Sequence, residues 1–149
     1  MARTSSDIVI AAPPADIMNV IADFPAYPQW ATGVRQADVV SAGSSSGDGR
    51  ADEVHFVLDA APIRDEYNLG YVWNGDAGVS WKIVAPGSML TGMDGSYHLD
   101  PIEDGTRVTY QLEVNVSIPM LGMLKRKAEK VVIDTALKGL KRRVEDLRA

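Results

Sequence analysis

Residues 119–147 read PMLGMLKRKAEKVVIDTALKGLKRRVEDL, and this stretch decides the fold of the chain. No proline follows Pro119, and apolar or small side chains recur at spacings of three and four residues, which is typical of one face of a helix. The members of this stripe are Leu124, Ala128, Val131, Val132, Thr135, Ala136, Leu140, Val144 and Leu147. The pattern predicts one long C-terminal helix over residues 119–147.

The chain before this helix begins with a predicted strand, Thr4–Ile10, in which Ile8 and Ile10 share one face. Residues 11–14, AAPP, end the strand and open a short helix, since proline is tolerated at the first helical position. The apolar stripe of this helix consists of Ile17, Val20, Ile21 and Phe24. Residues 24–30, FPAYPQW, predict a compact aromatic turn or a second short helix.

Six more strands are predicted between turn signals. They are Val34–Ser41, Ala51–Leu58, Ile63–Trp73, Val79–Val84, Leu90–Asp100 and Thr106–Ile118. Asn74-Gly75 and Glu103-Asp104-Gly105 are typical of hairpin turns, and Gly43–Gly49 reads as a mobile loop. The connections are too short for crossover helices, so we predict one antiparallel sheet of seven strands.

Side chains alternate between the two faces of a strand, and the predicted inner face of the sheet is aromatic and aliphatic almost throughout. The last strand spans roughly 40 Å at about 3.3 Å per residue, and the helix spans about 44 Å at about 1.5 Å per residue. Because a long twisted sheet curves away from a straight helix, we expect a gap between the two. The small helix residues that leave this gap partly open are Ala128, Thr135, Ala136 and Gly139.

The composition fits a single domain over residues 1–149. The chain has no cysteine, which excludes thiolate metal sites, iron–sulfur clusters and a cysteine nucleophile. No apolar run approaches the roughly 20 residues of a membrane span, and the N-terminus lacks the apolar stretch of a signal peptide. We therefore expect a cytoplasmic protein, without a cofactor or a metal.

The net charge of −5 hides an asymmetry along the chain. Residues 1–116 carry 6 Lys and Arg against 16 Asp and Glu, whereas residues 117–149 carry 9 against 4. The basic C-terminal segment is either a solvated helix face or a contact with an anionic surface. The apolar segment Ile118–Leu124 is either a buried helix start or an adaptable lip at the mouth of the gap. The acidic body argues against a nucleic-acid partner.

Few side chains suggest a reaction. His55 and His98 alternate with inward-facing apolar residues, so both should face outward, away from any zinc site or catalytic triad. Asp65 is the one carboxylate on the inner side of its strand, where it is either a solvated rim residue or, in an enzyme, the proton-transfer group. Four tyrosines either orient a ligand through their hydroxyls or belong to the core: Tyr67, Tyr71, Tyr97 and Tyr110.

Three short patterns mark the chain: Ala12-Pro13-x-x-x-Ile17, Phe24-Pro25-x-Tyr27-Pro28-x-Trp30 and Pro119-x-x-Gly122-x-Leu124-Lys125. With the tyrosine-rich strand Ile63–Trp73, their order resembles the START-like helix-grip superfamily over essentially the whole chain. The nearest branch is the bacterial polyketide cyclase/dehydrase and lipid-transport proteins. The resemblance implies an α+β helix-grip fold, with a seven-stranded antiparallel sheet wrapped around a long C-terminal helix and two short helices after the first strand. It also implies an apolar tunnel for lipids, polyketides, quinones or hormones.

Three hypotheses follow for the function. The first is a carrier or sensor that binds a small hydrophobic molecule between the sheet and the helix. The second is a cyclase or dehydratase that acts in the same cavity through Asp65 or a tyrosine. The third is a protein- or membrane-contact module that uses the basic helix and the apolar lip. The residues expected to contact a ligand are Trp30, Phe56, Leu58, Tyr67, Tyr71, Trp81, Tyr97, Tyr110, Met123, Val131, Val132 and Thr135.

Overall fold

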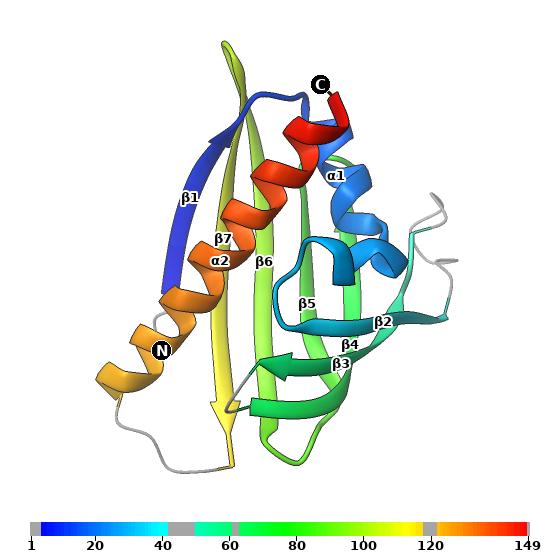
Figure 1. Cartoon of the computed structure of the whole chain (residues 1–149), viewed down its shortest axis with the longest axis vertical. Coiled ribbons are helices and arrows are strands. Elements are labelled where there is room, and N and C mark those ends of the chain that lie inside the picture. Colours follow the sequence, from blue (N-terminus) through cyan, green and yellow to red (C-terminus); the bar gives the residue numbers. More distant parts are fainter. Residues whose placement is uncertain (1–3, 42–49, 61–62, 118–121, 149) are drawn as a thin grey trace.

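A computed structural model describes residues 4–41, 50–60, 63–117 and 122–148 of the chain (Figure 1). Its seven strands form one antiparallel sheet in the order β1-β7-β6-β5-β4-β3-β2. The strands are β1 (Thr4–Ile10), β2 (Val34–Ser41), β3 (Glu53–Ala60), β4 (Ile63–Asn74), β5 (Gly78–Ala85), β6 (Leu90–Ile102) and β7 (Gly105–Val116). The chain therefore has the α+β helix-grip fold that the sequence predicts.

Three helices accompany the sheet: α1 (Pro14–Ala22), the short 3-10 helix η1 (Phe24–Gln29) and α2 (Gly122–Arg148). Pro14 takes the first position of α1, and Asp16 lies in the first turn, where the helix dipole favours a negative charge. Figure 1 shows α2 crossing the concave side of the sheet diagonally, with its C-terminal end beside α1. At the other edge of the sheet, β2 and β3 bend across the lower part of the molecule.

The strand boundaries lie within two residues of the predicted ones wherever both are described. Gly75, in the turn between β4 and β5, has a φ of 54°, a left-handed conformation that glycine adopts without strain. A Cβ at Gly105 would overlap the carbonyl of Ile10, so the β6–β7 hairpin needs glycine where it meets β1. The predicted loop Gly43–Gly49 and the predicted helix start at residues 119–121 lie outside the described residues.

The packed core lies where α1 and the C-terminal half of α2 meet the sheet. Its largest side chains with less than 2% exposure are Phe24, Ile10, Ile17, Met18, Ile21, Leu112, Ile133, Leu137, Leu140, Val54, Val108 and Val144. Burying each large aliphatic side chain contributes about 1.5–3 kcal/mol. The interior at this end of the sheet is therefore closely packed, and the inner face is less buried toward the other end of the sheet.

The buried face of α2 differs from the predicted one. Leu124, Val131 and Val132 are 56%, 61% and 51% exposed, and Thr135 is also exposed. The stripe that meets the sheet consists of Glu129, Ile133, Leu137, Leu140 and Val144. The prediction was right for Leu140 and Val144 and wrong for the exposed residues, because it joined apolar residues from more than half of the helix circumference and passed over the charged Glu129.

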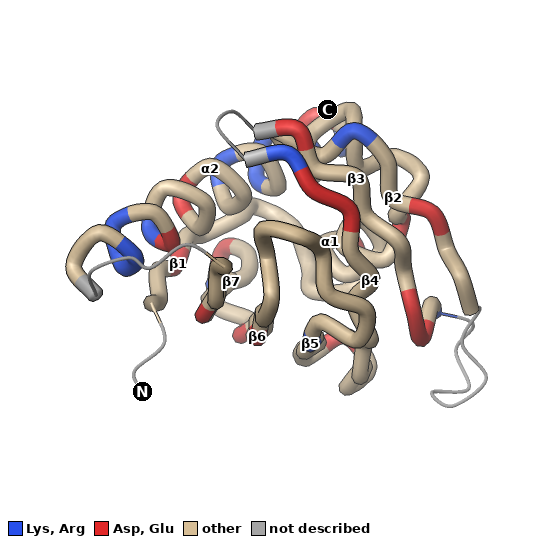
Figure 2. The backbone as a smooth tube through the Cα atoms, turned by 90° about the horizontal axis from the view of Figure 1, so that it is seen from below, with Lys and Arg blue, Asp and Glu red and all other residues tan. Residues whose placement is uncertain are grey.

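Basic residues follow α2, whereas acidic residues are frequent along the strands (Figure 2). Two of the lysines on α2 form ion pairs with acidic residues of the same helix. Lys130 is 2.7 Å from Asp134 and Lys141 is 2.6 Å from Glu145, each one helical turn along α2. None of the described helices is long and apolar enough to cross a membrane.

Candidate functional site

Six aromatic residues predicted to contact a ligand lie together on the concave face of the sheet. They are Phe56, Tyr67, Tyr71, Trp81, Tyr97 and Tyr110, each less than a tenth exposed. The period-two alternation of β3 to β7 turns them to one side, and cross-strand pairing sets their neighbours. The ring centroids of Tyr97 and Tyr110 are 4.7 Å apart, and that of Trp81 is 5.3 Å from Tyr97 and 5.8 Å from Tyr71. These separations fall in the range of favourable aromatic contacts.

Glycine makes room for the largest of these rings. A Cβ at Gly95 on β6 would overlap the indole of Trp81, which is its cross-strand partner on β5. The indole of Trp81 therefore lies flat over the backbone of β6, and the tyrosines flank it. Phe24 of η1 closes the row, with its ring 4.9 Å from that of Tyr71.

The hydroxyls of four of these tyrosines have no hydrogen-bond partner in the part of the chain that the structure describes: Tyr67, Tyr71, Tyr97 and Tyr110. Tyr27 differs, since it donates its hydroxyl to the carbonyl of Ile21 at 2.5 Å. Among the described residues, Trp30 Nε1 alone is a fully enclosed polar side-chain atom without a partner. The four tyrosine oxygens are therefore not fully enclosed, and they border space that a water molecule can reach.

These hydroxyls also lie near one another. Burial raises the pKa of Tyr71 well above its ordinary value, and the neighbouring hydroxyls of Tyr27, Tyr67, Tyr110 and Tyr97 raise it further. The pKa values of Tyr97 and Tyr110 are raised in the same way, first by burial. The tyrosines therefore keep their protons at physiological pH and act as neutral hydrogen-bond donors.

The concave face becomes half-exposed toward the end of the sheet that lies away from α1. The apolar inner-face residues there are Leu58, Ile83, Met93, Val114 and Val116, which are partly buried and pack against the core. Val114 pairs with Met93, just beyond the aromatic row. We refer to these half-buried apolar residues, which lie between solvent and the aromatic row, as the apolar mouth.

Trp30 lies between η1 and α2, beside the aromatic row and away from the half-buried residues of β5 to β7. Its ring centroid is 4.8 Å from that of Tyr27, and its backbone carbonyl would clash with a Cβ at Gly139 of α2. Gly139 therefore lets α2 approach η1 closely. The indole N–H of Trp30 is a donor without a partner among the described residues, which makes Trp30 a candidate contact beside the tyrosines.

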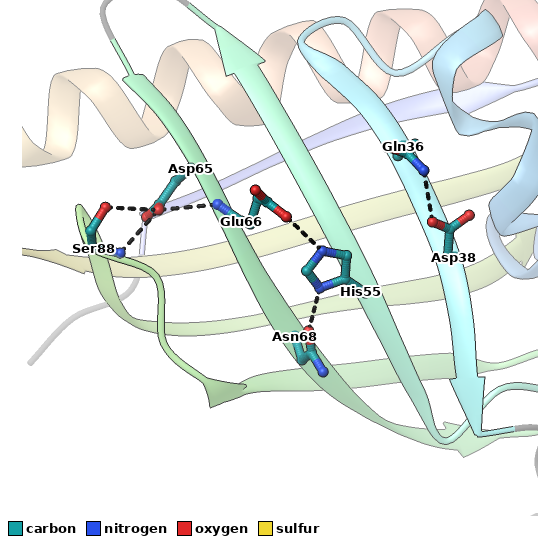
Figure 3. A network of polar contacts seen from close by, with 7 residues as sticks. All are labelled: Gln36, Asp38, His55, Asp65, Glu66, Asn68 and Ser88. Carbon is teal, nitrogen blue, oxygen red and sulfur yellow. Dashed lines mark hydrogen bonds and ion pairs between the residues drawn. The ribbon is translucent and has the colours of Figure 1, made fainter.

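Asp65 is on the inner side of β4 and only 8% exposed, but its carboxylate turns to the β5–β6 connection (Figure 3). It accepts backbone N–H bonds from Glu66 and Ser88, both at 3.0 Å, and from Met89 and Leu90 at 3.0 and 2.7 Å. Burial opposes ionisation, but these bonds outweigh it and leave the pKa of Asp65 below its ordinary value. A carboxylate so fully bonded is poorly suited to proton transfer.

Glu129 is the second carboxylate on the inner side and the one that sequence reasoning missed. It is 3% exposed and accepts a hydrogen bond from Thr4 Oγ1 at 2.6 Å and one from the backbone N–H of Val114 at 2.7 Å. The register of β1 against β7 begins at Thr4 and Leu112, so Val114 lies beyond the end of β1. Glu129 thus completes the edge of β7 and anchors α2 there.

Both histidines face outward, as predicted. His55 Nδ1 is 2.6 Å from Asn68 Oδ1 and its Nε2 is 3.1 Å from Glu66 Oε1 (Figure 3). The Asn68 hydrogen bond is the main cause that raises the pKa of His55. His98 Nε2 lies 3.0 Å from Asp100 Oδ1. The described residues contain no cluster of three or more side chains that could hold a metal ion.

Two depressions lie on the part of the molecule that the structure describes. One, of about 290 Å³, is bordered by α1, η1 and the end of α2, including Asp23 and Arg143. The other, of about 400 Å³, is bordered mainly by outer-face residues such as Val72 and Val84, together with Tyr71 and Trp81. Both have charged rims, and neither is bordered by Tyr67, Tyr97 or Tyr110.

The four helix residues predicted to contact a ligand are exposed on α2 and do not belong to the buried aromatic row. Met123 is 81% exposed, and Val131, Val132 and Thr135 are exposed along α2. Leu58 lies at the mouth. Sequence reasoning passed over Met93 and the unpaired indole N–H of Trp30. The alternation of β6 would have marked Met93, since it shares the parity of Tyr97.

A family model described as polyketide cyclase/dehydrase and lipid transport matches residues 1–145. No curated protein matches the chain in sequence. Among solved structures, a START superfamily protein from Mycobacterium smegmatis is 21% identical with a TM-score of 0.89, and 99% of each chain is covered. A Thermus thermophilus protein has 21% identity and a TM-score of 0.80, again with 99% of each chain covered. The Zhui aromatase/cyclase of a Streptomyces species has 11% identity and a TM-score of 0.72, with 96% of this chain and 93% of that chain covered.

Proposed function

Since the chain belongs to the polyketide cyclase/dehydrase and lipid-transport family, we propose that it is a carrier or sensor that holds a small hydrophobic molecule between the sheet and α2. The ligand enters by the apolar mouth of Leu58, Ile83, Met93, Val114 and Val116 and lies against the aromatic rings. Phe56, Trp81 and the four tyrosines then form its main contacts, with Trp30 beside them.

One observation carries this proposal: four tyrosine hydroxyls lie in an apolar interior without protein partners among the described residues. A buried hydroxyl without a partner costs free energy, so a folded protein normally satisfies it. Water or a ligand can satisfy these hydroxyls, and an aromatic wall with a few converging polar groups is typical of ligand pockets. The half-exposed mouth supplies a path for the ligand.

The proposal is tested by titrating the full chain with fatty acids, quinones and aromatic polyketides while following its tryptophan fluorescence. We expect saturable binding of one ligand per chain, with quenching from Trp81. Native mass spectrometry of protein purified from its own host should show a co-purified small mass. A folded protein that binds no member of any apolar class would refute the proposal.

A second candidate function is contact with an anionic membrane surface through α2. Leu124, Val131 and Val132 are more than half exposed, and Arg126 and Lys127 lie exposed among them. Exposed apolar residues flanked by cations are the features of an interfacial helix. Such a contact would bring the carrier to a membrane, where an apolar ligand is loaded or released.

Liposome sedimentation with anionic and with neutral vesicles tests this second function. The double variant Leu124→Ser/Val131→Ser should bind anionic vesicles less than the wild type, and binding should weaken as salt rises. The matched control is Val72→Ser/Val84→Ser, which removes two valines that are 70% and 55% exposed on the outer face of the sheet. Equal binding to both vesicle types, or equal loss in both variants, would count against a membrane contact through α2.

The cyclase or dehydratase hypothesis finds no comparable support in the site. Asp65, its proposed proton-transfer group, is committed to the backbone of the β5–β6 connection. The four tyrosines keep raised pKa values, so they donate hydrogen bonds more readily than they release protons.

A further inference from the structure

The hydroxyls of Tyr67, Tyr71, Tyr97 and Tyr110 come from three different strands and meet in one interior. Tyr97 of β6 and Tyr110 of β7 are direct cross-strand partners. Tyr67 and Tyr71 are four residues apart on β4, so both lie on its inner face. A core could be filled at these positions by phenylalanine, with no hydroxyl to satisfy. Four donors that converge without an acceptor among the described residues therefore point to an acceptor that comes from outside.

We infer that the ligand is a neutral molecule with carbonyl or hydroxyl oxygens, each of which accepts hydrogen bonds from one or two of the hydroxyls of Tyr67, Tyr71, Tyr97 and Tyr110. The inference rests on the proposed function and names the ligand class of that same site. The aromatic wall around Trp81 selects flat or chain-like apolar skeletons, and the tyrosine hydroxyls select for oxygen on them.

The charges around the site exclude an anionic ligand. The two carboxylates on the inner side, Asp65 and Glu129, already hold backbone N–H groups, and no lysine or arginine lies among the described inner-face residues of the strands. Lys125 of α2 is bonded to Asn115 at 3.2 Å, and Arg143 is bonded to Gln29 at 2.9 Å. A ligand carboxylate would therefore be buried without a cation, which is costly.

The protonation state of the tyrosines supports the same ligand class. Burial keeps their pKa values above the ordinary value, so each hydroxyl carries its proton and can donate to a carbonyl oxygen. A pure hydrocarbon would cover the hydroxyls and leave them unpaired. An oxygen-bearing ligand on the same skeleton should therefore bind more tightly, by about tenfold for each bond gained.

The test compares three ligands on one tricyclic skeleton, fluorenone, fluorene and a fluorene carboxylate, by titration calorimetry with the full chain. A parallel series uses dodecanone, dodecane and dodecanoate. We expect the ketone of each series to bind most tightly, at least five- to tenfold tighter than the hydrocarbon, and the carboxylate to bind most weakly. These comparisons use the same folded protein, so differences in stability do not enter.

Single variants then test which tyrosine hydroxyls cause the preference for the ketone. Tyr71→Phe and Tyr97→Phe should each lower the affinity for the ketone about five- to tenfold and leave the affinity for the hydrocarbon unchanged. Tyr27→Phe is the control, because its hydroxyl is already bonded to the carbonyl of Ile21. It should lower the melting temperature and leave the ratio of ketone to hydrocarbon affinity as it is in the wild type.

The outcomes separate this inference from the proposed function. Equal affinity for ketone and hydrocarbon, or tightest binding of the carboxylate, would overturn the inference and leave the carrier function standing. A ketone preference that survives in Tyr71→Phe and Tyr97→Phe would overturn the assignment to these hydroxyls. If no member of either series binds the folded protein, the proposed function fails together with the inference.

Discussion

Gly87 lies so close to Asp65 that a Cβ at this position would overlap the carboxylate. Gly87→Ala should therefore push the β5–β6 connection away from Asp65 and break some of its backbone hydrogen bonds. Because bonds to a charged acceptor contribute about 1.5–3 kcal/mol, we expect a loss of roughly 2 kcal/mol in the free energy of unfolding. Urea unfolding measures this loss.

The control for this change is Gly92→Ala on β6, where a Cβ would meet mainly the flexible side chain of Asn115. That side chain can move aside, so the variant should lose clearly less stability than Gly87→Ala. Equal losses in the two variants would show that Asp65 does not hold the connection.

The lowered pKa of Asp65 links its hydrogen bonds to the pH dependence of stability. A carboxyl with a depressed folded-state pKa stabilises the protein fully above its ordinary value of 3.8, and this stability is lost as the pH falls through the folded-state pKa. Asp65→Asn should therefore be about 2 kcal/mol less stable than the wild type near pH 7. The difference should shrink as the pH falls below about 4.

Urea unfolding of both proteins at a series of pH values measures this difference. Asp104→Asn, in the exposed turn between β6 and β7, serves as the control and should run parallel to the wild type. If the difference in unfolding free energy between Asp65→Asn and the wild type stayed constant down to about pH 3, Asp65 would not be the group that links stability to pH.

The inner position of Asp65 could be predicted from strand alternation. Its partners could not, because Ser88, Met89 and Leu90 bind it through backbone groups that carry no sequence signal.

At the scale of the element, hydrogen bonds hold α2 at two places along its length, one in its N-terminal half and one in its C-terminal half. Glu129 joins its N-terminal half to Thr4 and Val114, while Lys141 and Glu145 reach the backbone of Val9 and Ala11 near the end of β1. The helix therefore crosses the sheet at a fixed angle, even where few apolar residues pack beneath it. This anchoring keeps the N-terminal half of α2 in place above the mouth.

Glu129→Gln tests this anchoring. A neutral amide replaces the charged carboxylate, so the Val114 N–H keeps at best an uncharged acceptor and the Thr4 hydroxyl must turn round to accept from the amide N–H. We expect a loss of about 2–3 kcal/mol in unfolding free energy and faster amide exchange at Val114. In a double-mutant cycle, Thr4→Val should cost less in the Glu129→Gln background than in the wild type. Additive losses with unchanged exchange at Val114 would argue that Glu129 anchors nothing.

The existence and extent of α2 were predictable, because helical spacing persists over nearly thirty residues without a proline. Its buried face was not, for two reasons. Val131 and Val132 are apolar but exposed, so hydrophobicity alone pointed to the wrong side. Glu129 is charged but buried, because it accepts hydrogen bonds from Thr4 and from the backbone N–H of Val114, and these partners are known only once β1, β7 and α2 are packed together.

At the scale of the whole molecule, the strand order was implied by short connections and by hairpin turns, so the sheet and its inner face could be predicted. The long connection from β1 to β2 through α1 and η1 places these two strands at opposite edges. The sequence pattern could not predict which part of the concave face is fully covered by packed side chains and which part is only half-buried. The core is solid beside α1, where Ile10 and Val108 are fully buried, and half-open at Met93 and Val116.

Access to the interior therefore depends on residues at the open end of the sheet. Leu58 and Val114 are half-buried there, on opposite sides of the concave face, on β3 and β7. Leu58→Trp/Val114→Trp should narrow the mouth and slow the association of an apolar fluorescent dye at least tenfold. Stability should change by less than about 1 kcal/mol, because partly exposed positions accept a larger side chain with little strain. Stopped-flow fluorescence and thermal unfolding measure the two effects.

The control is Val84→Trp, which adds the same ring on the outer face, where Val84 is 55% exposed. It should bind the dye at the rate of the wild type. If the mouth variant also associates at that rate, ligands reach the tyrosines by another path, and the gap between α2 and η1 beside Trp30 becomes the alternative route. If both tryptophan variants slow association equally, the dye is reporting a surface contact instead of entry. A delay confined to the Leu58 and Val114 side would tie binding to the concave interior, because the half-buried apolar residues there adjoin tyrosine hydroxyls that have no partner among the described residues.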